Sequence, residues 1–289
     1  MNNEYYNNKY NAQESSVIFW EDILKKLEER DIEIFRIIVS SGVSEEKDAK
    51  DIVKKIFTDK YSSSLGLDVI WRTIKTLSDC GLLDKIRIAT GYRPFNILIV
   101  TEVGKQLYRK LFLKEPPKQE HQKLKKDHSS ILHAYMIKDV KTILEKTGNF
   151  SKVTMGRSEN RIPLYEGKAV IPDVIGYTNN FPSCFIEVEC GNHNQEQFNE
   201  KCNKLAHLTR FIIIVGRSRD DVTNLLKPQV DRFIRFRGRE SLKVAEIHIY
   251  LYSIADLSKG KSTYHYDMSS DEPICGFGRK AKEVYDNEQ

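Results

Sequence analysis

The stretch IPDVIGYTNNFPSCFIEVECGNHNQEQFNEKCNKLAHLTRFIIIV, residues 171–215, sets the architecture of the second half of the chain. Its pattern predicts a short apolar strand, a loop, a second apolar strand, an amphipathic helix and a third apolar strand. Asp173 lies on the first strand, and Glu187 and Glu189 lie on the second. Because successive side chains of a strand alternate between its faces, the two glutamates leave the same face.

Two interpretations of these carboxylates compete. Glu187 and Glu189 alone would suit a sheet edge at which both face water. Asp173, however, lies within the apolar run AVIPDVIGY. The next helix carries polar side chains at i, i+4 and i+7: Gln197, Lys201 and Lys204. Since buried carboxylates repel one another and lose hydration, a cation between them or nearby basic side chains would stabilise them, and the combination favours a site for a hard divalent cation.

The order of these motifs resembles the PD-(D/E)XK nuclease superfamily, which has the restriction-endonuclease-like fold. The shared features are Pro-Asp on one strand, Glu-x-Glu on the next strand, and then a helix and a further apolar strand. The resemblance implies that Asp173 and Glu187 are ligands of one or two Mg²⁺ (or Mn²⁺) ions. The carbonyl of Val188 is then a candidate third ligand.

The chain departs from the family pattern at Glu189, where the family usually has a lysine. Some branches of the family carry that lysine on the following helix, which makes Lys201 or Lys204 the candidate here and Gln197 a further one. Glu189 itself would complete the metal ligands or orient the attacking water. This departure leaves two functions open.

The first function is metal-assisted hydrolysis of a DNA phosphodiester. Asp173 and Glu187 would then bind the metal, with Lys201 or Lys204 stabilising the nucleophile or the developing charge. The second is a DNA-binding accessory protein or regulator without catalysis, in which the nuclease fold serves as a platform. The absence of the usual lysine at Glu189 favours this second function.

Composition permits a nucleic-acid partner without requiring one. The chain has 289 residues, a formal charge of +5 and a pI near 8.7, and 40% of its residues are apolar. This length predicts two domains. No run approaches the roughly 20 apolar residues that cross a bilayer, and the polar N-terminus has no signal-peptide core, so we expect a cytoplasmic protein without membrane contact.

The five cysteines are an odd number and lie in or beside apolar segments, which favours reduced, buried thiols. A zinc site is an alternative for four residues: Cys190, His193, Cys202 and His207. It is disfavoured, because Cys202 belongs to the apolar stripe of its helix and His207 is rotated off that face.

Residues 17–113 resemble a winged helix-turn-helix domain, after a disordered tail at 1–16. Apolar spacing predicts helices that end at Gly42 and Gly81, a third helix between them, two short strands and a closing helix. The resemblance implies that Arg72 and Lys75, with Thr73 and Thr76 beside them, face the major groove from the helix that ends at Gly81. It implies phosphate or minor-groove contacts from the wing by Lys85, Arg87 and Arg93. Dimerisation or protein docking is the alternative role of such a domain.

Residues 114–127 contain two prolines and many charges, which predicts an exposed linker. We therefore expect an α+β and α/β protein: a winged-helix domain, then a restriction-endonuclease-like α/β domain with a mixed central sheet at 128–256, and a flexible tail at 257–289. This domain order resembles the replication-relaxation proteins of plasmids and conjugative elements, which implies a DNA partner and a role in mobile-element replication, transfer or defence. A homodimer is a further expectation, since nucleases that cut both strands commonly work as dimers.

Overall fold

The computed structural model describes residues 20–62, 65–89, 93–128, 130–157, 160–164, 168–179, 181–191, 193–268 and 274–275. The predicted tail at 1–16 lies outside these residues. The chain forms two compact units, the first made of residues 1–87 and 96–120 and the second of residues 88–95 and 121–289. No helix in the described part of the chain is long and apolar enough to cross a membrane.

The described residues of the first unit form five helices and most of a two-stranded sheet, which connects α5 to α6. Its elements are α2 (Trp20–Leu24), α3 (Glu29–Ser41), α4 (Glu46–Tyr61), α5 (Leu67–Asp79), β1 (Leu83–Ile88), β2 (Phe95–Val100) and α6 (Glu102–Phe112). Helix α3 ends as predicted at Gly42, whose φ of 67° is the left-handed conformation that glycine adopts without strain. Buried apolar side chains of α3, α4, α5 and β2 form one core.

Thr73 on α5 faces this core and not solvent, which corrects the prediction that it contacts DNA. It is 3% exposed, and its hydroxyl donates a hydrogen bond of 2.6 Å to Asp31 Oδ1. The reason lies in helix geometry, because Thr73 is spaced three and four residues from the buried Ile70 and Leu77.

Replacing Thr73 with valine is expected to lower the free energy of unfolding by about 1.5–3 kcal/mol, since the buried Asp31 loses a hydrogen bond to its carboxylate. Thr76→Val is the matched control, because the half-exposed Thr76 hydroxyl donates only to the carbonyl of Arg72 in its own helix. Its effect should stay within about 0.5 kcal/mol. Chemical denaturation of both variants measures the difference, and equal effects would contradict the buried role of Thr73.

The predicted linker is wrong for residues 119–127. Residues Glu120–Asp127 form a helix, α7, and Gln119 is buried. The side chain of Gln119 accepts a hydrogen bond of 2.8 Å from the Val100 amide and donates one of 3.1 Å to the Leu98 carbonyl. Gln119 thus pairs with backbone groups of β2 that would otherwise need water, a contact that the charged composition of this segment conceals.

The second unit is built on a seven-stranded mixed sheet with the order β11-β10-β9-β8-β7-β6-β3. Along the chain its first elements are α8 (Ile131–Thr147), β3 (Lys152–Met155), β4 (Ile162–Pro163), β5 (Ala169–Val170), β6 (Val174–Thr178), β7 (Phe181–Glu189), α9 (Gln195–Ala206) and β8 (Phe211–Gly216). The strands β3, β6 and β7 pair antiparallel in succession, whereas β7 and β8 are parallel. This is the mixed α and β fold with a mixed sheet that the sequence predicts.

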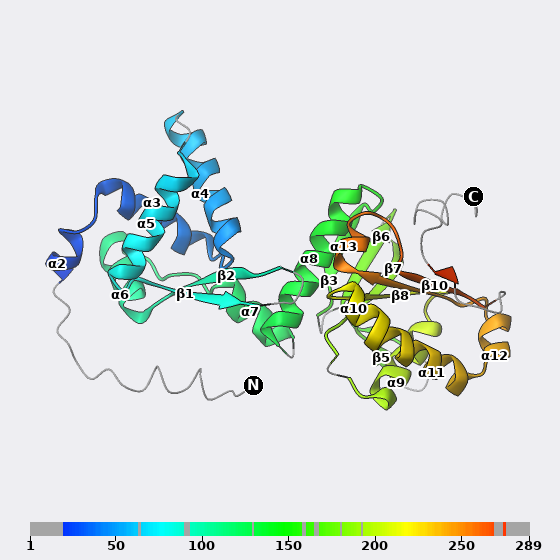
Figure 1. Ribbon diagram of the computed structural model, residues 1–289. Helices are drawn as coiled ribbons and strands as arrows, with labels where there is room; N and C mark the ends of the chain where they lie inside the picture. The colour runs from blue at the N-terminus through cyan, green and yellow to red at the C-terminus, as the bar shows by residue number, and fades with distance from the viewer. Residues whose placement is uncertain are drawn as a thin grey trace. The chain divides into compact units, whose positions relative to one another are not determined.

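The chain continues through helices to the other edge of the sheet. These elements are α10 (Arg219–Asp221), a π-helical segment η3 (Val222–Leu226), α11 (Lys227–Arg237), α12 (Arg239–Val244), β9 (His248–Ser253), α13 (Ile254–Leu257), β10 (Tyr264–Asp267) and β11 (Ile274–Cys275). Figure 1 shows α9 and α11 on one side of the sheet and α8 on the other. The π-helical turn ends immediately before α11, whose first turn contains Pro228, the residue at which the sequence predicts a kink.

The two faces of β7 point into different cores. Ile186 and Val188 pack with α8, whereas Phe185 packs with Phe198 and Cys202 of α9. The glutamates between them therefore lie on the α9 side, as strand alternation predicts.

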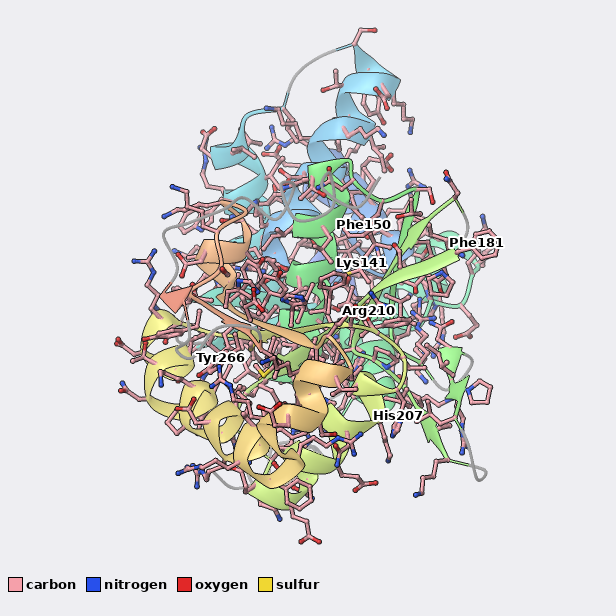
Figure 2. The ribbon with its side chains drawn as sticks, turned by 90° about the vertical axis from the view of Figure 1, so that its right-hand side faces the viewer. Lys141, Phe150, Phe181, His207, Arg210 and Tyr266 are labelled. Atoms are coloured by element: carbon pink, nitrogen blue, oxygen red, sulfur yellow. The ribbon has the colours of Figure 1, made fainter. Side chains whose placement is uncertain are left out.

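The predicted flexible tail is wrong for residues 257–268. Strand β10 pairs antiparallel with β9, and Tyr266 and Met268 are each 4% exposed. The Tyr266 hydroxyl, labelled in Figure 2, donates a hydrogen bond of 2.9 Å to Asp231 Oδ1 on α11. The segment is rich in serine, aspartate and lysine, so its composition suggests a flexible tail although it contains the short strand β10.

Candidate functional site

Three acidic side chains converge at one end of the central strands. Asp173 directly precedes β6, and Glu187 and Glu189 lie at the C-terminal end of β7. The pairing of Val174 with Ile186 places Asp173 next to Glu187 on neighbouring strands. The three residues are 8%, 2% and 3% exposed, respectively. The sequence therefore predicts this grouping correctly, and the burial shows that the glutamates are not a solvated sheet edge.

Lys201 of α9 lies among the three carboxylates. Its Nζ is 2.5 Å from Glu187 Oε2, 3.4 Å from Asp173 Oδ2 and 3.6 Å from Glu189 Oε1. The Lys201 side chain is only 22% exposed, so these attractions act in a medium of lower dielectric than water. One lysine thus faces three acidic side chains.

Further contacts fix the position of Asp173. Its Oδ2 accepts a hydrogen bond of 2.8 Å from the Val188 amide, and Nε2 of His133 lies 3.3 Å from the same oxygen. The carbonyl of Asp173 accepts a hydrogen bond of 2.7 Å from the Gly156 amide. Backbone groups from two strands therefore hold this residue in place.

Glu189 has a second partner besides Lys201. Nδ1 of His193, in the loop before α9, lies 2.8 and 2.9 Å from the two carboxylate oxygens of Glu189. The carbonyl of His193 in turn accepts a hydrogen bond of 3.2 Å from Gln229 on α11. Glu189 is thus oriented by a histidine that is itself fixed to a neighbouring helix.

The environment moves the pKa values of the site in opposite directions. Burial raises the pKa of Glu187 well above its ordinary value, and the nearby Lys201 does not offset this effect. Burial also acts on Asp173, but Lys201 and His133 hold the pKa of Asp173 below its ordinary value. The pKa of Lys201 is raised, because the attraction of the carboxylates outweighs burial. Neighbouring carboxyls with separated pKa values are suited to divided acid and base roles.

The residues fit a hard divalent cation. Both carboxylate oxygens of Glu187 are buried and accept no well-formed hydrogen bond from the described residues, so the ion-pair contact with Lys201 is their main polar interaction. Asp173, Glu187 and Glu189 together offer carboxylate oxygens on one face, which is the donor type that Mg²⁺ and Mn²⁺ take.

Two other predicted candidates do not join the cluster. Lys204 forms an ion pair of 2.6 Å with Glu200 on its own helix. Gln197 is part of the helix cap, since its Oε1 accepts a hydrogen bond of 3.1 Å from the Asn194 amide. Of the polar side chains predicted on α9, Lys201 alone contacts the carboxylates among the described residues.

The alternative zinc set is not assembled either. Cys202 is 3% exposed in the apolar core, whereas His207 is exposed at the C-terminal end of α9 (Figure 2). Cys190 Sγ lies 3.2 Å from the sulfur of Met136, and burial raises the pKa of its thiol to about 12. Cys80, Cys184, Cys190 and Cys202 form no disulfide, and of these only Cys184 and Cys202 are buried, so the predicted burial holds for two of the four.

The basic residues predicted to contact DNA differ in their surroundings. Arg72 is exposed and pairs with Asp68 on the same helix at 2.8 Å, and Lys75 and Arg87 are exposed. Lys85 pairs with Glu46 at 2.8 Å. Arg93, which belongs to the second unit, forms a bidentate pair of 2.6 and 2.9 Å with Asp139. Lys85 and Arg93 are thus already engaged within the chain.

His133 is the site residue that the sequence does not reveal. It lies in the first turn of α8, forty residues before Asp173, and neither its spacing nor its neighbours in the sequence indicate a site residue.

Comparison of the chain with models of known protein families, with curated proteins and with solved structures finds no match. The functional assignment therefore depends on the geometry of the site.

Proposed function

We propose that the second unit hydrolyses DNA phosphodiesters with the help of a divalent metal ion. The observation that carries the proposal is the contact of one lysine, Lys201, with three buried carboxylates. The element order α8, β3, β6, β7, α9, β8, with β7 parallel to β8, supports a restriction-endonuclease-like fold. In that fold the acids and the lysine would lie at the positions that the resemblance to PD-(D/E)XK nucleases implies.

The residues take distinct roles in this proposal. Asp173 and Glu187 hold the ion, and Glu189, oriented by His193, completes the ligands or orients the attacking water. A bound Mg²⁺ or Mn²⁺ ion offsets charge on the phosphate and lowers the pKa of water. Lys201 donates hydrogen bonds to the nucleophile or to the negative charge that develops on the phosphate.

The first unit would hold the DNA duplex. The order α3, α4, α5, β1, β2, α6 supports a winged helix-turn-helix domain, in which α5 enters the major groove. The exposed Arg72 and Lys75 on α5 and Arg87 on β1 are then the contacts to DNA. A role in the replication, transfer or defence of mobile elements fits this pairing of domains.

A DNA-binding protein without catalysis is the second candidate. The observation that favours it is that Lys201 already pairs with Glu187 at 2.5 Å, so the cluster has a cation of its own. In this alternative the carboxylates and Lys201 are a structural ion-pair network.

A plasmid-nicking assay separates the two candidates. The wild-type chain with Mg²⁺ or Mn²⁺ is expected to convert supercoiled plasmid to open circles. Asp173→Asn should slow this conversion by at least about 100-fold, because it removes a metal ligand and several kcal/mol of charge stabilisation. Lys204→Ala, which alters the surface pair with Glu200, should retain the activity.

Salt-dependent binding of duplex DNA is the control for both variants. Binding should survive Asp173→Asn and weaken as salt rises, because phosphate neutralisation releases counterions. Intact DNA binding by a wild-type chain that nicks with neither metal would establish the non-catalytic candidate.

A further inference from the structure

Helix α11 ends in a segment that combines arginines with aromatic rings, RFIRFRGR at residues 232–239. Phe233 is buried in the core, whereas Phe236 is 65% exposed. Its two neighbours in the sequence, Arg235 and Arg237, are exposed as well. The end of the helix thus presents an exposed aromatic ring between two cations.

A cavity of about 340 Å³ lies on one side of this ring. It is lined by Arg237, by residues of α9 and by Lys168, which directly precedes β5. Among the described residues that line it, Lys168, Lys204 and Arg237 are cationic, and Glu200 is the one carboxylate. Because Glu200 pairs with Lys204 at 2.6 Å, Lys168 and Arg237 are the cations that face a ligand in this cavity.

A second cavity, of about 350 Å³, includes the other neighbour of Phe236. Two arginines line it, Arg235 and Arg239. Of its two carboxylates, Asp231 pairs with Lys227 at 2.9 Å. Cationic side chains therefore lie on both sides of Phe236, as an anionic chain that crosses the ring requires.

Helix electrostatics explain only part of this arrangement. The C-terminal end of α11 carries partial negative charge, which favours Arg235 and Arg237 there. It gives no reason to expose Phe236, whose burial would be favourable, or to place Lys168 of another segment beside Arg237. A ligand with both negative charge and a flat apolar surface would account for all four residues.

Unpaired nucleotides have this combination of properties. Phosphates line one edge of a single strand, and its bases offer flat faces on which aromatic rings and arginine guanidinium groups stack. In a duplex the bases stack on one another, and a phenylalanine ring carries no hydrogen-bonding group that could read their edges. The exposed ring therefore favours a single strand over a duplex.

We propose that Lys168, Arg235, Phe236 and Arg237, together called the α11 surface, bind single-stranded DNA. A base stacks on the Phe236 ring, and the cations contact phosphates on either side of it. The proposal rests on the proposed function only in taking DNA as the ligand, and it does not depend on hydrolysis. It gives the second unit a substrate class, unpaired DNA, that duplex binding by the first unit does not supply.

Fluorescence anisotropy of a labelled single-stranded DNA oligonucleotide of about 16 nucleotides tests the α11 surface in the full chain, with EDTA present to prevent cleavage. Phe236→Ala should weaken binding by about 5–150-fold, the range expected for the loss of one stacked base, whereas Phe236→Trp should retain it. Phe181→Ala is the matched control, because Phe181, labelled in Figure 2, is 75% exposed at the start of β7. It should bind like the wild type.

The salt dependence of binding tests the phosphate contacts. Arg237→Ala and Lys168→Ala should each lower the slope of log affinity against log salt by about 0.7, the contribution of one phosphate contact on a single strand. Lys259→Ala removes an exposed lysine that follows α13 and should leave the slope unchanged.

A wild-type chain that does not bind the single strand, or equal losses in Phe236→Ala and Phe181→Ala, would overturn the proposal. Tighter binding of an RNA oligonucleotide of the same sequence would also overturn it. Circular dichroism checks that each variant folds, and Asp173→Asn should bind the single strand like the wild type. Single-strand binding without plasmid nicking would support the α11 surface and contradict the proposed hydrolysis, and nicking without single-strand binding would do the reverse.

Discussion

Replacing Lys201 with methionine is expected to lower the free energy of unfolding by about 3–5 kcal/mol, the usual cost of leaving buried charges without their partner. Methionine keeps the apolar stem of the side chain but removes the ammonium group. In the wild type, Lys201 Nζ lies 2.5 Å from Glu187 and 3.4 Å from Asp173, and the variant leaves these two acidic side chains without that cation. Denaturant titration at neutral pH measures the loss.

The destabilisation should shrink in acid. Burial raises the pKa of Glu187, and Lys201 lowers the pKa values of both Glu187 and Asp173, so its removal should raise both. The folded variant then binds more protons than the folded wild type, so lowering the pH stabilises the variant relative to the wild type. Mn²⁺ should also recover part of the loss, by about 2.7 kcal/mol at 100 times its Kd.

Lys204→Met is the matched control for Lys201→Met. Lys204 lies on the same helix and pairs with Glu200, whose side chain is 65% exposed, so its removal should cost no more than about 1 kcal/mol. Equal losses in the two variants, or a loss at Lys201 that neither acid nor Mn²⁺ reduces, would show that the lysine does not compensate the carboxylates.

Gly156→Ala is expected to displace Asp173 and to reduce nicking by about 100-fold, the scale of a misplacement of a catalytic group by roughly 1 Å. A Cβ atom at Gly156 would lie 2.0 Å from the Pro172 carbonyl oxygen and 3.3 Å from the Asp173 Cα. These neighbours are backbone atoms, so no side-chain rotation relieves the clash. The segment that carries Asp173 has to move, at a cost in stability of about 1–3 kcal/mol.

Gly176→Ala provides the comparison, because it adds the same methyl group on β6 itself. Its Cβ would meet the ring of Phe150 at 2.7 Å, and that side chain, labelled in Figure 2, is able to shift. This variant should lose stability but keep Mn²⁺ affinity and nicking. A Gly156→Ala chain that binds Mn²⁺ and nicks like Gly176→Ala would mean that the position of Asp173 is not critical.

Local periodicity explains how much of the fold the sequence predicts. The elements β6, β7, α9 and β8 follow from apolar spacing, since helix and strand periods are set by neighbouring residues. The proximity of Asp173 to Glu187 is also predictable, because Asp173 lies at the start of one apolar strand and Glu187 near the end of the next, which pairs with it antiparallel. The tail is different, since Tyr266 becomes buried only through its contacts with α11 and β9.

The residues of the site can be predicted only in part from the sequence, because some of them meet through contacts between distant segments. Two lysines on α9 are equivalent by spacing, and the surface pairing of Lys204 with Glu200 is what separates it from Lys201. His133 approaches Asp173 because α8 packs against β6 and β7, a long-range contact without a local signal. Histidines of this kind are found from the fold and not from a motif.

A calorimetric titration with Mn²⁺ decides whether the buried carboxylates hold a divalent ion. The wild-type chain is expected to bind Mn²⁺, and Asp173→Asn, which changes one oxygen to an amide nitrogen, should abolish the binding heat while circular dichroism remains unchanged. Identical Mn²⁺ binding by the two chains, or no binding by the wild type, would contradict a metal centre at Asp173, Glu187 and Glu189.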